Sequence, residues 1–220
     1  MVSTRSHPAE EISIMSNQAD SSSTAGSSPS HQADSSTAGT APARKVVAAY
    51  FLSLDGVAEA PDKFLTSWDD ETDASGADLI ATQDTVILGR RTYDDWSGFW
   101  PTSDIQPFAD FVNAAPKYVA TSTPLTGSWA NSYPIEGDLT TFVRTLKTQP
   151  GGDIGIHGSI SITQSLLAAN LVDELRLVIA PTIVGTGRRL LDTLAPTHLQ
   201  PTPATTTPSG NLLITYRVLH

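Results

Sequence analysis

The amino-acid sequence predicts one α/β domain with a mostly parallel central sheet. From Lys45 onwards, apolar runs of strand length alternate with helical segments, which is the pattern of strands joined by crossover helices. Several of these runs are apolar without interruption, as expected for strands that are covered on both faces. The 220 residues, of which 39% are hydrophobic, suffice for one sizeable core. We therefore predict a single folded domain over residues 44–220.

The preceding segment, residues 1–43, has the composition of a disordered tail. Ser, Thr, Ala, Gly, Asp and Gln dominate it, and it offers almost no aromatic or β-branched apolar side chain to bury. It contains a near-duplicate, residues 18–26 and 32–39, whose polar content is typical of slipped low-complexity sequence. We predict that this tail takes no part in the fold.

The first half of the domain contains two clear strand signals. Residues 46–52 read Val-Val-Ala-Ala-Tyr-Phe-Leu, a continuous apolar run that predicts the first strand. A loop at Asp55-Gly56 follows, then an acidic stretch and a helix at about residues 74–81. A second apolar run, residues 85–88, predicts the next strand, which ends at Gly89.

The second half continues the alternation. A third strand is expected at residues 117–120, and a helix at residues 139–147 with Asp138 as its N-cap. Further strands are expected at two apolar runs, residues 153–157 and 175–180. The helix between them carries apolar residues at helical spacing, namely Ile162, Leu166 and Leu167. Residues 211–218 alternate in a way that suits a closing antiparallel edge strand.

Composition excludes several classes of function. The formal net charge is −10, and the segment from Arg44 onwards carries 12 basic and 19 acidic residues, so binding to nucleic acid or to an anionic membrane is disfavoured. The chain has no cysteine, which excludes a disulfide scaffold and a thiol nucleophile. Of the five histidines, two lie in the tail and one is terminal, so we predict no metal site. Without a membrane-spanning run or a secretion signal, we expect a soluble, cytoplasmic protein.

Three of the predicted strands end in residues that suit phosphate. These strand ends are Gly89-Arg90-Arg91-Thr92, Thr121-Ser122 and Gly158-Ser159. In an open α/β sheet the carboxyl ends of the strands line the ligand crevice, and free N–H groups at the following helix starts attract anions. The set indicates a nucleotide, although each glycine alone could be a plain turn residue. Neither the G-x-G-x-x-G fingerprint nor a P-loop motif occurs in the chain.

The order and spacing of several motifs resemble the dihydrofolate-reductase-like family. They are Ser53-Leu54-Asp55-Gly56, Leu88 to Tyr93, Gly158-Ser159 followed by Leu171 to Leu177, and Ala180 to Gly187. The closer resemblance is to the reductase domain of the bifunctional riboflavin-biosynthesis deaminase-reductase and its stand-alone relatives. It covers about residues 45–218. The resemblance implies an eight-stranded mixed sheet flanked by helices, with NADPH lying across the strand ends.

The resemblance also implies a set of cofactor contacts. Residues expected at the nucleotide are Phe51 beside the nicotinamide, Gly89, Arg90, Arg91 and Thr92 at the phosphates, Thr121 and Ser122 near the 2′-phosphate, and Gly158, Ser159 and Ile160 at the pyrophosphate. Arginine suits this task because its planar donor fork matches phosphate. The alternative is that Arg90 and Arg91 are solvated helix-start residues, although two arginines there oppose the helix dipole. Thr121 and Ser122 could equally cap a turn before Pro124.

Reduction also requires a proton, for which a carboxyl group is a common source. Within the acidic run 69–73, Asp73 lies sixteen residues before Gly89, a spacing similar to that of the acid in true dihydrofolate reductases. The run could instead be a solvated face. Asp55 is a second candidate, or an ordinary turn residue, and Ser53 and His157 are candidates for binding substrate. Trp68, Trp96 and Trp100 either line the cavity or pack in the core.

These observations predict an NADPH-dependent reductase of a small molecule, of the 5-amino-6-(5-phosphoribosylamino)uracil reductase type. Two alternatives remain open. One is a reductase of dihydrofolate or another pterin-like or carbonyl substrate, because Val57 to Ala60 replace the basic residues expected after Gly56. The other is a non-catalytic nucleotide-binding protein. By resemblance, a homodimer that pairs through exposed strands and the segment Val172 to Leu175 is plausible.

Overall fold

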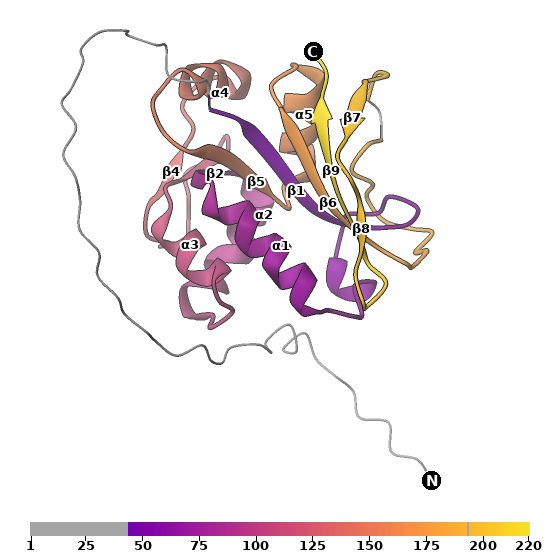
Figure 1. Ribbon diagram of the computed structural model, residues 1–220. Helices are drawn as coiled ribbons and strands as arrows, with labels where there is room; N and C mark the ends of the chain where they lie inside the picture. The colour runs from indigo at the N-terminus through magenta and orange to yellow at the C-terminus, as the bar shows by residue number, and fades with distance from the viewer. Residues whose placement is uncertain (1–43, 193) are drawn as a thin grey trace, which may run out of the picture.

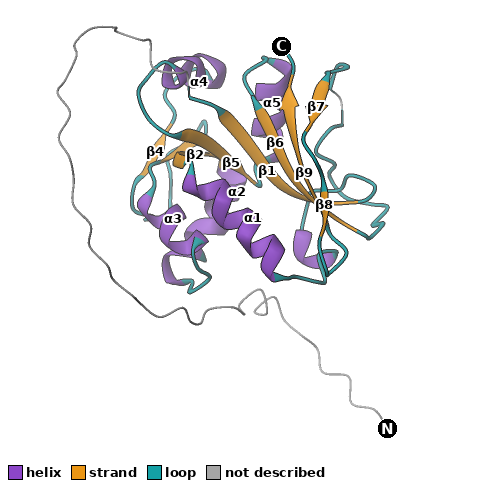
Figure 2. Ribbon diagram, in the orientation of Figure 1, coloured by secondary structure: helices purple, strands orange, loops and turns teal. Residues whose placement is uncertain are grey.

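A single mixed sheet with helices on both faces forms the body of the protein (Figures 1 and 2). The computed structural model describes residues 44–192 and 194–220, and the predicted tail, residues 1–43, lies outside the described residues. The strands are β1 (Val46–Ser53), β2 (Gln83–Gly89), β3 (Lys117–Ala120), β4 (Ser132–Pro134), β5 (Asp153–His157), β6 (Glu174–Ala180), β7 (Leu199–Pro201), β8 (Thr205–Thr206) and β9 (Leu212–Val218). The helices are α1 (Asp70–Ala81), α2 (Arg90–Ser97), α3 (Phe108–Ala114), α4 (Leu139–Lys147) and α5 (Ile160–Ala168), with 3-10 turns η1 (Pro61–Lys63) and η2 (Trp100–Thr102).

The strand order is β4-β3-β2-β5-β1-β6-β9-β7, and β8 also pairs with β9. All pairs from β4 to β6 are parallel, whereas β9 runs antiparallel to its three partners β6, β7 and β8. The predicted α/β class, with a mostly parallel sheet and an antiparallel closing strand, is confirmed. The described sheet has nine strands where the resemblance implied eight, because the short β8 pairs beside β9, off the main path.

Alternation along β1 explains how the sheet is covered. Val46, Ala48, Tyr50 and Leu52 point to one face, where they pack with α4 and α5 in the main core. A second core lies beneath α2 and α3 and is built from Val86, Leu88, Tyr93, Val112, Ala115, Val119 and Trp129. Figure 1 shows α1 in front of the sheet and α5 behind it. Both faces of the central strands are therefore covered, as their uninterrupted apolar sequences predict.

The opposite face of β1, β6 and β9 is covered less completely. Ala49 of β1 pairs in register with Arg176 of β6, which pairs with Thr215 of β9. Ala49 also pairs with His157 of β5 on its other side. Because paired residues in a sheet point to the same face, these four side chains form one row across four strands. The next row along the strands is Phe51, Val178 and Leu213. These rows form the floor of a cavity beneath α1.

Two N-caps set the starts of helices at opposite ends of the domain. The Asp138 carboxylate accepts the Thr141 N–H at 2.8 Å, which confirms the predicted cap and helix α4. Asp69 caps α1 in the same way, accepting the Thr72 N–H at 2.9 Å. Helix α1 therefore starts four residues before the predicted position, within the acidic run. This extra turn contains Asp73.

Candidate active site

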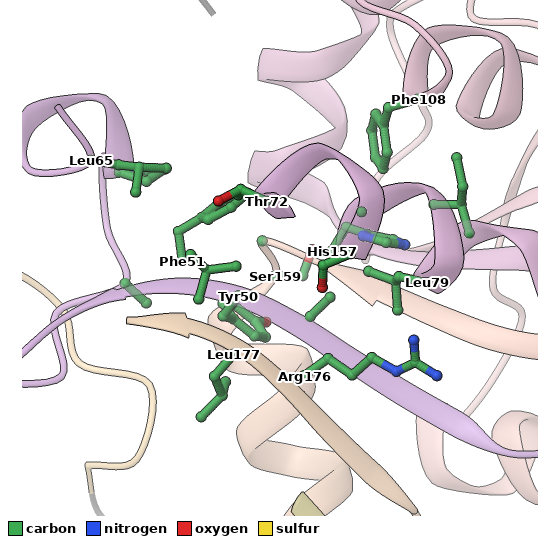
Figure 3. A pocket seen from close by; sticks show the side chains of 18 of the residues that line it. Tyr50, Phe51, Leu65, Thr72, Leu79, Phe108, His157, Ser159, Arg176 and Leu177 are labelled. Atoms are coloured by element: carbon green, nitrogen blue, oxygen red, sulfur yellow. The ribbon is translucent and has the colours of Figure 1, made fainter. Parts of the chain in front are cut away.

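A cavity of about 1150 Å³ opens between α1, the sheet floor and the starts of α2 and α5 (Figure 3). Of the residues predicted from the sequence, the cavity is lined by Phe51, Asp73, Gly89, Arg90, Arg91, Thr92, His157, Gly158, Ser159 and Ile160. Trp68, Trp96 and Trp100 line it as well, and Trp96 and Trp100 also pack against the second core, so both predicted alternatives hold for these two. Residues that are far apart in the sequence thus line one cavity.

The starts of α2 and α5 are joined by the Ser159 side chain. Its hydroxyl accepts the Gly89 N–H at 2.9 Å and donates to the Thr92 hydroxyl at 3.0 Å. Neither helix has a side-chain cap, so N–H groups of both first turns have no capping partner from the N-cap residue. Gly158, between β5 and α5, has a left-handed backbone with φ of 70°. Two uncapped helix starts beside a glycine form an arrangement suited to phosphate.

The two arginines at the start of α2 have different surroundings. The Arg90 guanidinium binds the Asp94 carboxylate at 2.8 Å and donates to the Thr123 hydroxyl at 2.6 Å and the Pro124 carbonyl at 2.9 Å. The side chain of Arg91 is 73% exposed and pairs with Glu59 at 3.3 Å. Arg90 is therefore held against the loop after β3, whereas Arg91 is largely exposed and has one acidic partner.

Thr121 and Ser122 do not line the cavity, contrary to the predicted set. The Thr121 hydroxyl donates to the Thr123 carbonyl at 2.8 Å and lies 3.4 Å from an Arg90 nitrogen. It therefore braces the loop that holds Arg90, in agreement with the turn-capping alternative. Ser122 is exposed on the same loop. The cluster of Arg90, Thr121 and Thr123 nevertheless presents a cation and two hydroxyl groups at adjacent strand ends.

Asp73 stands on the opposite wall, on the first turns of α1. Its carboxylate accepts a hydrogen bond from the Trp68 indole N–H at 2.6 Å. The Trp68 ring in turn packs on Phe51 of the floor, with 5.4 Å between ring centroids. Asp73 is thus fixed in direction beside an aromatic surface. Asp69 of the same acidic run caps helix α1, whereas Glu71 and Asp73 line the cavity.

His157, at the end of β5, is a buried member of the cavity wall. Its Nε2 lies 2.8 Å from the Gln83 side-chain oxygen, and its ring packs edge-on against Phe108 at 5.2 Å. Burial lowers the pKa of His157 from its ordinary value of 6.5 to about 4. The ring is therefore neutral near pH 7. In the tautomer that donates from Nε2 to Gln83, its Nδ1 is an acceptor.

The lowered pKa of His157 predicts a loss of stability in acid. A group that protonates more readily in the unfolded chain contributes stability above its unfolded pKa, and that contribution falls as the pH drops from about 6.5 to about 4. Its full size is about 3 kcal/mol. Chemical unfolding followed between pH 7 and 4.5 should show this loss in the wild-type protein and a smaller one in His157→Gln. The exposed His198 is the matched control, and a pH profile of His198→Gln that matched His157→Gln would contradict the assignment.

Asp55 and Ser53 lie outside the cavity, and both predicted roles need correction. The Asp55 carboxylate accepts the Ser53 hydroxyl at 2.7 Å and the N–H groups of Val184 at 3.0 Å and Gly185 at 2.9 Å. These hydrogen bonds, of which that from Val184 is the largest influence, hold the pKa of Asp55 well below its usual range. Arg189 pairs with the same carboxylate at 3.2 Å. Asp55 joins the loops after β1 and β6, and its depressed pKa is the opposite of what a proton donor needs.

The segment Val172 to Leu175, predicted to contribute to a dimer contact, lies inside the subunit. Val172 and Leu175 are buried in the main core. Asp173 accepts the Val46 N–H at 2.7 Å and also binds Lys147. Strand β6 is paired on both sides, with β1 and β9. A second copy therefore cannot add a strand to β6, and the homodimer itself stays a prediction.

Sequence reasoning missed part of the cavity wall. Arg176 on β6, Thr215 on β9 and the loop residues Thr202 and Pro203 all line the cavity. The only signal that could have found Arg176 is its place in an otherwise apolar strand, Glu-Leu-Arg-Leu-Val-Ile-Ala. Which face it occupies depends on strand order, which the sequence leaves open.

Comparison with known proteins gives a consistent picture. The sequence profile of the RibD C-terminal domain family matches residues 44–213. The uncharacterized protein YyaP of Bacillus subtilis (strain 168) is 27% identical over 179 residues, which span 79% of this chain and 94% of that protein.

Solved structures share the fold at low identity. A Shewanella sp. PV-4 protein named for riboflavin biosynthesis matches with a TM-score of 0.66 at 19% identity, over 80% of this chain and 99% of that chain. Dihydrofolate reductase from Enterococcus faecalis, solved as a complex with NADP(H), matches with a TM-score of 0.54 at 15% identity, over 80% of this chain and 97% of that chain. The dihydrofolate-reductase-like fold implied by the sequence motifs is confirmed.

Proposed function

We propose that this chain, which belongs to the RibD C-terminal domain family, is a reductase that uses NADPH to reduce a small ring compound. The observation that carries the proposal is the pairing of two uncapped helix starts, at Gly89 and Ser159, on the same cavity as the Asp73 carboxyl group. A phosphate-binding corner and a carboxyl group on one cavity form an arrangement that suits nucleotide-dependent reduction. The Enterococcus dihydrofolate reductase, which has this fold, was solved with NADP(H), and this supports the choice of cofactor.

The residues present fit NADPH. The corner at Gly158 leaves room for a phosphate to approach the backbone. No protein atom fills the space where a Cβ would stand, because the nearest atom to such a Cβ would be a Trp96 ring carbon at 3.6 Å. Backbone N–H groups at the starts of α2 and α5 would hold the pyrophosphate, and Arg90 and Arg91 would hold the remaining phosphate. When bound, NADPH supplies the hydride. The chain's own part is to bind the nucleotide, exclude water with its aromatic wall, and supply a proton from Asp73.

The substrate that we propose is of the 5-amino-6-(5-phosphoribosylamino)uracil type. Family membership supports this class of substrate. A pterin-like substrate is the second candidate, and a specific observation favours it. Trp96 packs edge to face on Trp100 and Phe108 along one wall of the cavity, and the Trp100 and Phe108 rings are tilted against each other. The ring centroids lie 4.8 to 5.8 Å apart, and such a wall suits a flat bicyclic ring.

An NADPH oxidation assay with the full chain tests the proposal. The candidate substrates are 5-amino-6-(5-phosphoribosylamino)uracil, dihydrofolate and small carbonyl compounds. We expect turnover with the pyrimidine, and turnover with dihydrofolate alone would select the second candidate. Nucleotide binding without turnover of any substrate would favour the non-catalytic alternative. If neither NADPH nor NADH binds, the proposal is rejected.

Replacing Gly158 with Val should weaken NADPH binding by at least about tenfold, because the side chain would occupy the space where phosphate approaches the backbone. Its φ of 70° makes any side chain strained there, at a cost to folding of about 1 to 2 kcal/mol. Gly137→Val is the matched control, since Gly137 has φ of 80° on an exposed loop away from the cavity. Both variants should lose similar stability in thermal melts. Only Gly158→Val should lose nucleotide affinity in a fluorescence titration, and equal affinity in the two variants would remove this corner from the site.

A further inference from the structure

Arg176 is a cation on the floor of the cavity that shares its acidic partner, Glu174, with a second cation. Its side chain leaves the middle of β6 between Ala49 of β1 and Thr215 of β9, and Figure 3 shows it extending beneath Leu79 of α1. The Nε atom is buried and has no hydrogen-bond partner. Among the residues that the structure describes, the nearest acid is Glu174, whose Oε2 lies 3.7 Å from Nε. The other oxygen of Glu174 accepts a hydrogen bond from Lys45 at 2.8 Å.

The other arginines that line the cavity differ from Arg176 in both place and partners. Arg90, Arg91 and Arg188 lie at the helix starts or beside them. Each is engaged there: Arg90 with Asp94, Arg91 with Glu59, and Arg188 with the Ser161 hydroxyl at 2.8 Å. Arg176 alone of these four stands on the sheet floor. Strand β6 is two strand spacings from β5, so Arg176 lies roughly 10 Å from the strand that leads into α5.

Desolvating a guanidinium N–H without a partner is unfavourable, and arginine offers a planar fork that matches a carboxylate or a phosphate. The small side chain of Ala49 leaves space above the floor beside Arg176. We propose that Arg176 binds an anionic group on the substrate, so that it sets the preference of this reductase for substrates with a carboxylate or phosphate arm. This inference rests on the proposed function. The flat ring would lie over Ala49 between Asp73 and the aromatic wall, with its arm reaching Arg176.

The test uses matched pairs of ring compounds that differ in one anionic group. Pterin-6-carboxylate is compared with 6-hydroxymethylpterin, and uridine 5′-monophosphate with uridine. Affinities are measured by calorimetry for the full chain with saturating NADP⁺, which occupies the phosphate-binding corner. NADP⁺ is titrated first, and if it does not bind, the proposed function fails while the pairs are still compared without it.

In the wild-type protein we expect the anionic member of at least one pair to bind at least tenfold more tightly than the neutral member. The pair with the larger ratio of affinities shows whether the site prefers a carboxylate or a phosphate. Arg176→Met should bring that ratio to about one while leaving the neutral compounds and NADP⁺ unchanged. Arg176→Lys, which keeps the charge without the fork, should retain an intermediate ratio. Arg217→Met is the control, because Arg217 is exposed on β9 and does not line the cavity.

A structural role for Arg176 predicts a different pattern. Loss of a stabilising pair with Glu174 would lower the melting temperature of Arg176→Met, whereas removal of a partnerless buried N–H should leave it unchanged or raise it. Equal affinity for both members of each pair in the wild-type protein overturns the proposal. So does an anionic preference that survives in Arg176→Met.

Discussion

Replacement of Asp73 by Asn should lower the turnover number by about 100- to 10,000-fold, the range by which a positioned general acid accelerates a reaction. The amide keeps the shape of the side chain and can still accept the Trp68 indole hydrogen bond, but it cannot supply a proton. Nucleotide affinity should not change, because Asp73 stands on α1, across the cavity from the helix starts. Steady-state kinetics with the substrate identified in the oxidation assay, and a separate NADPH titration, check both expectations.

Asp78 provides the control for Asp73. It lies on the same helix and also lines the cavity, so Asp78→Asn removes an identical charge without removing the carboxyl group that Trp68 holds. Its turnover should stay within a few-fold of the wild-type value. Trp68→Phe should give an intermediate loss of turnover, because Asp73 keeps its carboxyl group but loses the indole N–H that orients it. Equal losses in Asp73→Asn and Asp78→Asn would show that the cavity needs negative charge and not a specific acid.

The strands were predictable because they are buried on both faces. Uninterrupted apolar sequences such as residues 46–52 leave little choice but a central strand, and β1, β3 and β5 occur where the sequence predicts them. The Asp138 cap and helix α4 were predictable for a local reason, since the signal lies within four consecutive residues. The short β4, β7 and β8 carry no such signal. They are strands only because a neighbouring strand offers them hydrogen bonds.

In the site, too, residues in local motifs were predictable, whereas residues placed by tertiary contacts were not. The paired corners at Gly89 and Gly158 follow from motifs at strand ends, and the structure brings them together through Ser159. The role of Asp55 could not be predicted, because its partners Val184 and Gly185 lie about 130 residues away. Arg176 was not predicted for a similar reason, because its position on the cavity floor depends on β6 lying between β1 and β9.

The two arginines at the start of α2 should differ in what they contribute to cofactor choice. Arg90 is held by the Asp94 carboxylate and by the Thr121 and Thr123 hydroxyl groups, so its guanidinium is already oriented, and a phosphate would bind it by replacing some of these contacts. Arg91 is 73% exposed and must lose side-chain freedom to bind an anion. An oriented fork beside two hydroxyl groups is the better site for the 2′-phosphate, which distinguishes NADPH from NADH.

Arg90→Ala should therefore weaken NADPH binding by roughly 10- to 100-fold, since a hydrogen bond to a charged group contributes about 1.5 to 3 kcal/mol and each 1.4 kcal/mol is a tenfold change. NADH lacks the 2′-phosphate, so its affinity should change little and it serves as the internal control for any damage to the loop after β3. Arg91→Ala should weaken NADPH binding less than Arg90→Ala does. If Arg91 binds the pyrophosphate, which both nucleotides have, the loss of affinity should be similar for NADPH and NADH.

Salt provides an independent check on the same assignment. A partly exposed pair of phosphate and guanidinium is screened, so the wild-type preference for NADPH should fall as ionic strength rises, and the smaller preference of Arg90→Ala should respond less. Titrations of the wild-type protein and both variants with both nucleotides at two ionic strengths decide the matter. Equal losses for NADPH and NADH in Arg90→Ala would assign this arginine to the fold, because the one group that differs between the nucleotides would then not touch it. Equal affinity of the wild-type protein for NADPH and NADH would contradict the choice of NADPH, because no residue at these strand ends would then bind the 2′-phosphate.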